Sequence, residues 1–231
     1  MTSRTATVLC VFLGALAVGW LARRSHASRQ QLAEAPAPTI NKQPMTLSTL
    51  TFDPAAPPST MPPLAPGENA ECDSEFRSSA NVHGDPQQTD ATHATITVTQ
   101  VNMTLQLIVN IWLPAGAAHR VTDHEDGHRQ ISEYYYRTAA ELAGRIAAKY
   151  LGKRIEITGA DLPAESSKAL QKLATDITDE YGRELNPEPA QLLYDSITDH
   201  GRNDVVVKNA VDHALKNAAI ESTPSPANPR D

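Results

Sequence analysis

The chain has 231 residues and a formal net charge of −7, so it lacks the basic surface that nucleic-acid binding requires, and no nucleic acid is expected as a partner. Of its two cysteines, Cys10 lies in an apolar run at the amino terminus and Cys72 lies far from it, which argues against an internal disulfide. Residues 71–221 have ordinary apolar content, and a segment of about 150 residues can bury roughly two thirds of its unfolded surface.

The amino-terminal segment contains an apolar run without charged residues, from Thr5 to Ala22, followed directly by Arg23 and Arg24. At 1.5 Å per residue a helix of this length spans about 27 Å, slightly less than the roughly 30 Å hydrocarbon core of a membrane. The run fits either a retained membrane anchor or the apolar region of a cleaved signal peptide, and the two arginines favour the anchor. We predict that residues 1–30 are a membrane anchor or signal segment. The folded part is then extracytoplasmic, either periplasmic or on the cell surface, and either membrane-anchored or secreted.

Proline dominates the next segment. Nine of the 17 prolines lie between Pro36 and Pro66, with alanine, threonine and serine among them. Such a composition does not propagate a helix, so residues 31–70 are predicted to be an extended, semi-rigid linker between membrane and domain. Residues 222–231 contain three more prolines and are predicted to be a disordered tail.

Two runs of alternating apolar residues predict strands. Thr95–Thr99 alternates threonine with isoleucine and valine, and in Met103–Leu113 every second residue is apolar. Residues 100–102 between the runs are a candidate hairpin connection, which would make the two strands antiparallel neighbours. Pro114 and Gly116 end the second strand.

Helical periodicity follows the strands. Apolar residues and histidines from His124 to Tyr150 recur at steps of three, four or seven, which predicts one long helix. A second helix is predicted to begin at Asp161–Pro163, and a third to run from Asn203 to about Ala219. Strands followed by helices indicate an α+β domain at residues 71–221, with an antiparallel strand pair, one helix directly after it and two further helices.

The first of these helices carries the motif His124-Glu125-Asp126-Gly127-His128. Histidines four residues apart project from one face of a helix, so both imidazoles can bind one tetrahedral zinc ion at about 2.0–2.1 Å. Glu125 lies about 100° further round the helix, where its carboxylate can take a proton from a water that the metal activates. The motif predicts a zinc-dependent hydrolase in which His124 and His128 are metal ligands and Glu125 is the general base.

A catalytic zinc site needs a third protein ligand and an open fourth position. The position ten residues after His124, which supplies a third histidine in one common pattern, is occupied by Tyr134. Glu141 on the same helix lies nearly five turns along the axis, too far to reach the same ion. The candidates that remain lie downstream: Glu156, Glu165, Asp199 and His200.

Two segments of the chain carry a family resemblance. The first, His124–Ile131, reads His-Glu-Asp-Gly-His-Arg-Gln-Ile, and the second, Tyr194–Gly201, reads Tyr-Asp-Ser-Ile-Thr-Asp-His-Gly. Together they resemble a bacterial family of secreted proteins that are predicted to be zinc-dependent proteases and were long catalogued as a domain of unknown function. The resemblance covers roughly Thr95 to Leu215. It implies a small zincin-like domain whose active-site helix contains the first segment.

The resemblance also implies a role for each polar residue of the second segment. His200 would complete the zinc site as the third ligand. Tyr194 would donate a hydrogen bond to a developing oxyanion, unless it is only packed in the core. The residues that would orient the ligating imidazoles are Asp195, Thr198 and Asp199.

These observations predict a zinc-dependent peptidase with zinc as its cofactor and a peptide or protein substrate that lies extended along Met103–Leu113. Another amide or ester hydrolase could use the same residues. The alternative from a different class is a non-catalytic envelope protein, anchored in the membrane through its amino-terminal helix, in which the metal is structural or absent. The sequence carries no signal for an oligomeric state.

Overall fold

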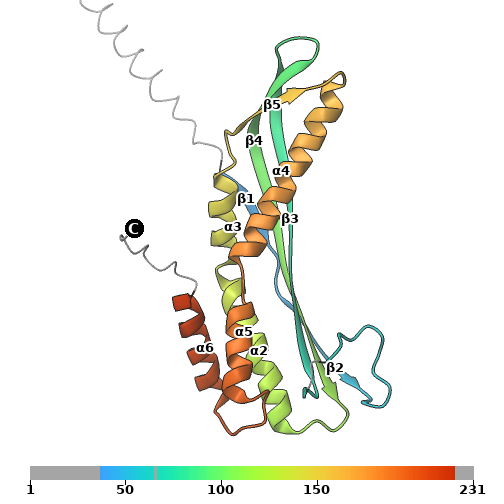
Figure 1. Cartoon of the computed structure of the whole chain (residues 1–231), viewed down its shortest axis with the longest axis vertical. Helices are drawn as coiled ribbons and strands as arrows, with labels where there is room; N and C mark the ends of the chain where they lie inside the picture. Colours follow the sequence, from blue (N-terminus) through green and yellow to red (C-terminus); the bar gives the residue numbers. More distant parts are fainter. Residues whose placement is uncertain (1–36, 65–66, 222–231) are drawn as a thin grey trace, which may run out of the picture. The chain divides into compact units, whose positions relative to one another are not determined.

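The computed structural model of the chain describes residues 37–64 and 67–221 (Figure 1). The predicted amino-terminal anchor and carboxy-terminal tail lie outside the described residues. The described residues from Pro38 onward form one compact unit. None of the described helices is long and apolar enough to cross a membrane.

A five-stranded sheet is built around one long central strand (Figure 1). The strands are β1 (Thr39–Lys42), β2 (Thr46–Phe52), β3 (Glu71–Gln88), β4 (His93–Pro114) and β5 (Arg154–Thr158). The central strand is β4, and β3 lies antiparallel along one side of it for nearly its whole length. The other side of β4 carries three short strands in succession, of which β5 is antiparallel and β1 and β2 are parallel to β4.

The predicted α+β class with an antiparallel strand pair is wrong. β1 and β2 pair parallel to β4, in registers that join Thr39 to Asn102 and Thr46 to Ile108, and helices pack on the sheet, so the arrangement is α/β. The error arises in the segment interpreted as a linker, because β1 and β2 both lie within residues 31–70. The prolines of this segment flank the two strands without interrupting them, so the paired residues keep their backbone N–H groups.

β4 is one continuous strand where the sequence predicts two strands joined at residues 100–102. Its buried positions change parity: even-numbered residues around Ile96 are buried in the first half, and odd-numbered residues from Val101 onward in the second. A β-bulge produces the change, because the pairing register shifts between His83 and Gly84 of β3 and leaves one extra residue in β4. The break in the alternation therefore marks a bulge and not a turn.

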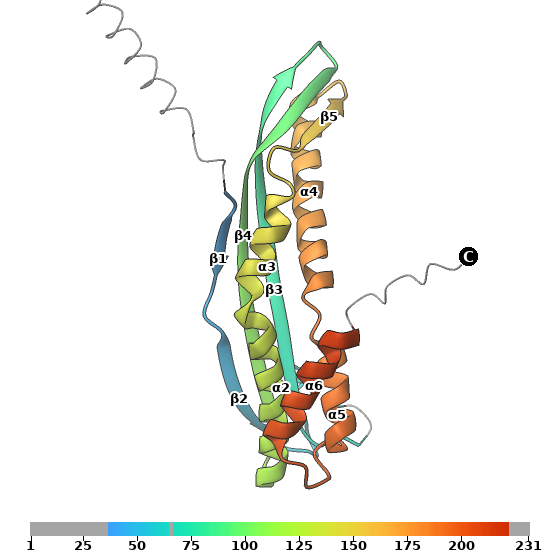
Figure 2. The same cartoon turned by 90° about the vertical axis from the view of Figure 1, so that its left-hand side faces the viewer.

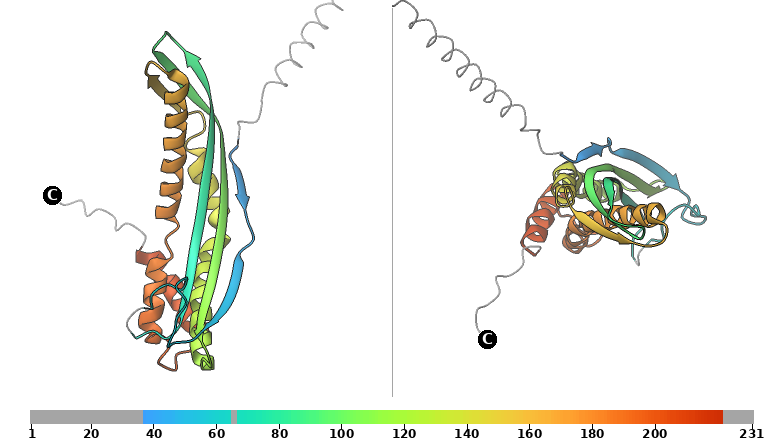
Figure 3. Two further views of the ribbon diagram at one scale, coloured as in Figure 1. Left: turned by 90° about the vertical axis from the view of Figure 1, so that its right-hand side faces the viewer. Right: turned by 90° about the horizontal axis from the view of Figure 1, so that it is seen from above.

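The described part of the chain contains five helices. They are α2 (His119–Arg137), α3 (Ala139–Ala148), α4 (Leu162–Glu184), α5 (Glu188–Thr198) and α6 (Val207–Glu221). α2, α3 and α4 lie along one face of the sheet, and α5 and α6 pack beside α2 (Figure 2). Figure 3 shows α4 running along β3 at the other end of the sheet from α5.

The helices differ from the predicted ones in several places. α6 begins at Val207, four residues later than the predicted Asn203. The single helix expected from His124 to Tyr150 is divided at Thr138 into α2 and α3, and α5 was not predicted. α4 begins as predicted, because the Asp161 carboxylate accepts a hydrogen bond from the backbone N–H of Ala164 at 3.0 Å and caps the helix.

The main core fills the space between sheet and helices. The odd-numbered residues of Val101–Ile111 are buried and pack against α3 and α4, for example against Ile146 and Ile177. A second, smaller core joins α2, α5 and α6 around Ile131 and Tyr194. This second core holds α5 against α2, so the two segments that carry the family resemblance lie side by side.

Candidate metal centre

A pocket of about 290 Å³ opens between α2, α5 and β3. Helix α2 supplies His124, Glu125 and His128 to this pocket, and α5 supplies Gln191 and Asp195. The third wall consists of the start of β3 and the segment before it. Its residues are Glu68, Ala70, Glu71, Cys72, Ser74 and Phe76.

His124 and His128 direct their Nε2 atoms at each other and at Asp195. The two Nε2 atoms are 3.3 Å apart. Asp195 Oδ1 lies 2.9 Å from Nε2 of His128 and 3.3 Å from Nε2 of His124. Ligand atoms at about 2.0–2.1 Å from a tetrahedral zinc ion lie about 3.3 Å from one another. The three atoms therefore have the spacing of three ligands around one zinc ion.

The other ring nitrogens of both histidines are held by α5. Nδ1 of His128 lies 2.7 Å from Gln191 Oε1, which can only accept its hydrogen. Thr198 Oγ1 donates to the carbonyl oxygen of Tyr194 at 2.8 Å, so it accepts from Nδ1 of His124 at 3.3 Å. Burial lowers the pKa of His128, but the Asp195 carboxylate beside its Nε2 outweighs this and raises it. When both imidazoles are neutral and both Nδ1 atoms donate, the Nε2 lone pairs face the centre of the site. Thr198 thus lies where the resemblance expects an orienting residue.

Gln191 is a site residue that the sequence analysis missed. It also donates through Nε2 to the carbonyl oxygen of His128 at 3.2 Å and to Ser132 Oγ at 3.0 Å, so its own side chain is held in place. The signal that could have found it is the helical spacing of i, i+3, i+4 and i+7, which puts four residues on the face of α5 that meets α2. These residues are Gln191, Tyr194, Asp195 and Thr198.

Two glycines allow the close approach of the two segments. Gly127 of α2 faces the ring of Tyr194, and a Cβ at this position would overlap the hydroxyl oxygen and Cζ of that ring. Gly201 faces His124, and a Cβ there would lie 2.8 Å from Cγ of the imidazole. Gly201 also has a φ of 71°, in the left-handed region that glycine enters without strain. Packing of the two segments therefore depends on glycine at both positions.

Tyr194 has a packing role in this structure. Its side chain is fully buried, its ring stacks on that of His124 with centroids 5.1 Å apart, and its hydroxyl donates to the carbonyl oxygen of His124 at 3.1 Å. Burial holds the pKa of Tyr194 well above its usual value. Tyr194 does not line the pocket that contains Glu125. Instead of the predicted hydrogen bond to an oxyanion, the Tyr194 hydroxyl makes a hydrogen bond that positions the backbone of His124, and the stacked ring of Tyr194 positions its imidazole.

Glu125 is 5% exposed and lines the pocket next to the two histidines. Burial raises the pKa of Glu125 to about 8, and nearby carboxylates such as Glu71 add to the effect. Burial also raises the pKa of Glu71 to about 7. A cation in the pocket would favour the ionised form of both carboxyl groups. For Cys72, burial raises the pKa of the thiol to about 12, so this cysteine is not a thiolate nucleophile at neutral pH.

His200, predicted to be the third ligand, forms a group with Glu68 and Asp195 and is not in the group of His124 and His128. Its Nδ1 is 3.2 Å from Glu68 Oε1 and 3.8 Å from Asp195 Oδ1. Asp195, expected only to orient a ligand, is the residue that forms a group with the two histidines. Asp199 points elsewhere and pairs with Arg202 at 2.7 Å, which removes it from the site.

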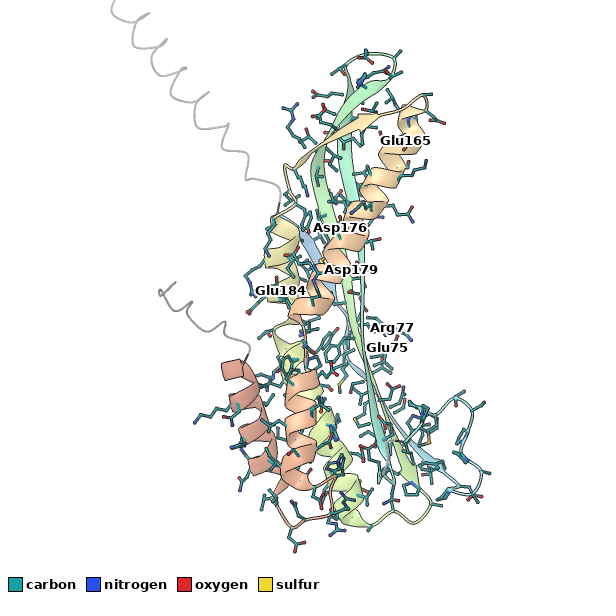
Figure 4. All side chains as sticks on the ribbon, in the orientation of Figure 1. Glu75, Arg77, Glu165, Asp176, Asp179 and Glu184 are labelled. Atoms are coloured by element: carbon teal, nitrogen blue, oxygen red, sulfur yellow. The ribbon has the colours of Figure 1, made fainter. Side chains whose placement is uncertain are left out.

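The remaining candidate ligands do not reach the pocket. Glu156 of β5 accepts a hydrogen bond from Thr95 at 2.9 Å. Glu165 stands near the amino-terminal end of α4, far along the sheet from α5 (Figure 4), and pairs with Lys168 at 2.9 Å. Neither residue lines the pocket between α2 and α5.

Within the described residues, His124, His128 and Asp195 form a group whose ligand atoms all lie within 4.8 Å of one another. No protein-family model, curated protein or solved structure matches this chain. Function is therefore inferred from the geometry of the pocket, and the family resemblance of the two segments stays a prediction.

Proposed function

We propose that this domain is a zinc-dependent peptidase in which His124, His128 and Asp195 hold the metal and Glu125 is the general base. One observation carries the proposal: two Nε2 atoms and a carboxylate oxygen converge at 2.9–3.3 Å while both Nδ1 atoms donate to α5. A metal ion at this point would be bound by both Nε2 lone pairs and by the Asp195 carboxylate, in place of the proton that His128 Nε2 shares with Asp195. The proposal replaces His200 by Asp195 as the third ligand.

The donor set also supports catalysis over a purely structural metal. Zinc held by two histidines and a carboxylate would supply a Lewis acid that polarises a carbonyl and lowers the pKa of water. Structural zinc sites are closed by a fourth protein ligand, whereas catalytic sites keep one position open. In the part of the chain that the structure describes, the group at His124 contains three ligand residues and no fourth.

Glu125 is suited to the role of base by its position. It follows His124 on α2 and lines the same pocket, so its carboxylate faces the space where a substrate carbonyl and a water would meet. Once ionised, the carboxylate accepts hydrogen bonds only, so it can hold a water and then take its proton. General-base catalysis of this kind contributes about 10²–10⁴-fold to a rate.

The substrate is proposed to lie along β3 and not along Met103–Leu113, as the sequence analysis expected. That part of β4 is paired on one side with β3 and on the other with β1 and β2, so no edge is left for a peptide. Among the described strands, β3 pairs only with β4, and its residues Cys72, Ser74 and Phe76 line the pocket. An extended peptide could pair with the free edge of β3 and pass the metal ligands.

The test combines metal analysis with a peptide library. Purified protein should retain about one zinc ion or more per chain and cleave peptides, and Glu125→Gln should keep its zinc while kcat/KM falls about 10²–10⁴-fold. Glu141→Gln is the matched control, because it makes the same change at an exposed position of the neighbouring α3. If wild-type protein with stoichiometric zinc cleaves no peptide bond in a broad library, peptidase action is refuted.

The same preparation distinguishes the structural alternative. For a catalytic site, Asp195→Asn should lose zinc affinity and activity but keep the circular dichroism spectrum of the fold, because the cores of the domain do not include the metal. A structural zinc ion would instead make folding depend on the metal. Unfolding of the wild type on treatment with a chelator would therefore support the non-catalytic envelope protein.

A further inference from the structure

A second group of metal-ligating side chains adjoins the first. Glu68, Asp195 and His200 each offer a ligand atom, and these atoms all lie within 4.8 Å of one another. Nδ1 of His200 is 3.2 Å from Glu68 Oε1 and 3.8 Å from Asp195 Oδ1. These separations resemble the roughly 3.3 Å between neighbouring ligands of a tetrahedral ion. Asp195 belongs to both groups, because its Oδ1 is also 2.9 Å from Nε2 of His128.

The backbone presents His200 to this group through an unusual turn. α5 ends at Thr198, and the next three residues, Asp199, His200 and Gly201, have φ values of 49°, 51° and 71°. Two consecutive residues other than glycine in the left-handed region are uncommon, and such conformations are concentrated at functional sites. Because Gly201 packs on His124, the turn also brings the second group next to the histidine pair.

The lining of the pocket is strongly acidic. Five of the residues that line it are acidic, and in the described part of the chain no lysine or arginine lines it. An acidic lining of this kind favours the binding of cations. The five acidic residues are Glu68, Glu71, Glu125, Glu188 and Asp195.

We propose that Glu68, Asp195 and His200 bind a second divalent cation, with Asp195 bridging it to the zinc ion at His124 and His128. The proposal rests on the proposed function for the first ion. The same oxygen, Asp195 Oδ1, lies nearest to both groups, so it would be shared by the two ions, or the side chain would rotate to give one oxygen to each. Paired sites in hydrolases hold two metals about 3.5–4 Å apart. A donor set of one imidazole and two carboxylates suits zinc or manganese. A second ion bound there would hold a substrate oxygen next to the zinc ion at His124 and His128.

Zinc stoichiometry tests the proposal. The full-length protein is stripped with a chelator, reloaded with zinc chloride, freed of excess zinc and examined by native mass spectrometry. Two zinc ions per chain are expected for the wild type, and one for Glu68→Gln and for His200→Gln. His213→Gln is the matched control, because it removes an exposed histidine of α6 outside the pocket and should still bind two. Circular dichroism identifies a variant that fails to fold, and either of the two substitutions suffices for the test.

The outcomes separate this proposal from the proposed function. One zinc ion in both the wild type and His200→Gln overturns the second site and leaves the peptidase proposal standing. One ion in the wild type and none in His200→Gln also overturns it, because His200 then belongs to a single site. No zinc in the wild type refutes the first site as well. As a second measurement, X-ray absorption of the loaded wild type should show a metal–metal distance of about 3.5–4 Å.

Discussion

Gly127 is the residue whose replacement tests the geometry of the site most directly. It lies inside α2, one residue before His128, and the Tyr194 ring occupies the space that a side chain would need. A Cβ built on Gly127 would overlap the Tyr194 hydroxyl oxygen and Cζ and would lie 3.0 Å from Cε1. Gly127→Ala therefore forces either the ring or the helix to move.

The ring has little freedom to move. Tyr194 is fully buried, stacks on His124 and is tied by its hydroxyl to the carbonyl oxygen of that residue. Forcing a methyl group into a packed core costs about 1–3 kcal/mol, and loss of the hydroxyl hydrogen bond adds about 0.5–1.5 kcal/mol. Alanine regains up to about 1 kcal/mol through its greater helix propensity. We expect Gly127→Ala to lower the free energy of unfolding by about 1–3 kcal/mol, with overpacking as the larger effect.

The matched control is Gly144→Ala in α3. A Cβ at Gly144 would meet Ile40 Cγ1 at 3.9 Å, an ordinary van der Waals contact, so only the gain in helix propensity remains. This variant should be more stable than the wild type by about 0.5–1 kcal/mol. Urea unfolding of the two variants measures both effects, and competition with a chelator measures zinc affinity, which should fall only for Gly127→Ala.

A lower free energy of unfolding for Gly127→Ala and a higher one for Gly144→Ala would support the packing of Tyr194 against Gly127. If Gly127→Ala is as stable as the wild type and binds zinc equally well, α5 does not lie against α2 in the way described. The role of Tyr194 in positioning His124 would then be refuted.

Further predictions concern the support of the ligands and the fold. Gly201→Ala should weaken zinc binding, measured by equilibrium dialysis, because its Cβ would lie 2.8 Å from Cγ of His124 at a φ of 71°; unchanged binding would contradict that contact. Gln191→Leu should weaken zinc binding about 10–100-fold by releasing Nδ1 of His128, as measured with a competing chelator. No measurable change would speak against its orienting role. Asp161→Ala should lower the free energy of unfolding by about 1 kcal/mol through loss of the cap of α4, with zinc binding intact. Zinc at about a hundred times its Kd should raise the free energy of unfolding by about 2.7 kcal/mol in urea titrations, and a chelator should abolish the gain.

Local patterns in the sequence predicted several parts of the structure. The spacing of His124 and His128 put both imidazoles on one face of a helix, and the structure brings their Nε2 atoms to 3.3 Å. Asp161 correctly marked the start of α4. Each of these features depends on residues within one or two turns of a single helix, which is why periodicity and capping rules could find them.

Other features depended on contacts between distant segments. β1 and β2 were missed because their pairing with β4 supplies the stability that their proline-rich surroundings lack. The apparent turn at residues 100–102 was a bulge, which becomes visible only when β3 is aligned with β4. Glu68 carries no sequence signal for the site, since it lies in the segment interpreted as a linker and reaches His200 across 132 positions of the chain.

The sequence by itself determined the chemistry that this protein can offer: a helical histidine pair with a glutamate between them, and a second polar segment near the carboxy terminus. Only the tertiary structure decided which residue of that segment meets the pair. Helix α5 continues through Thr198, so Asp195 faces His128, while the left-handed turn after it directs His200 to Glu68. The position at which a helix ends is set by its packing against other elements, and a motif alone does not contain that information.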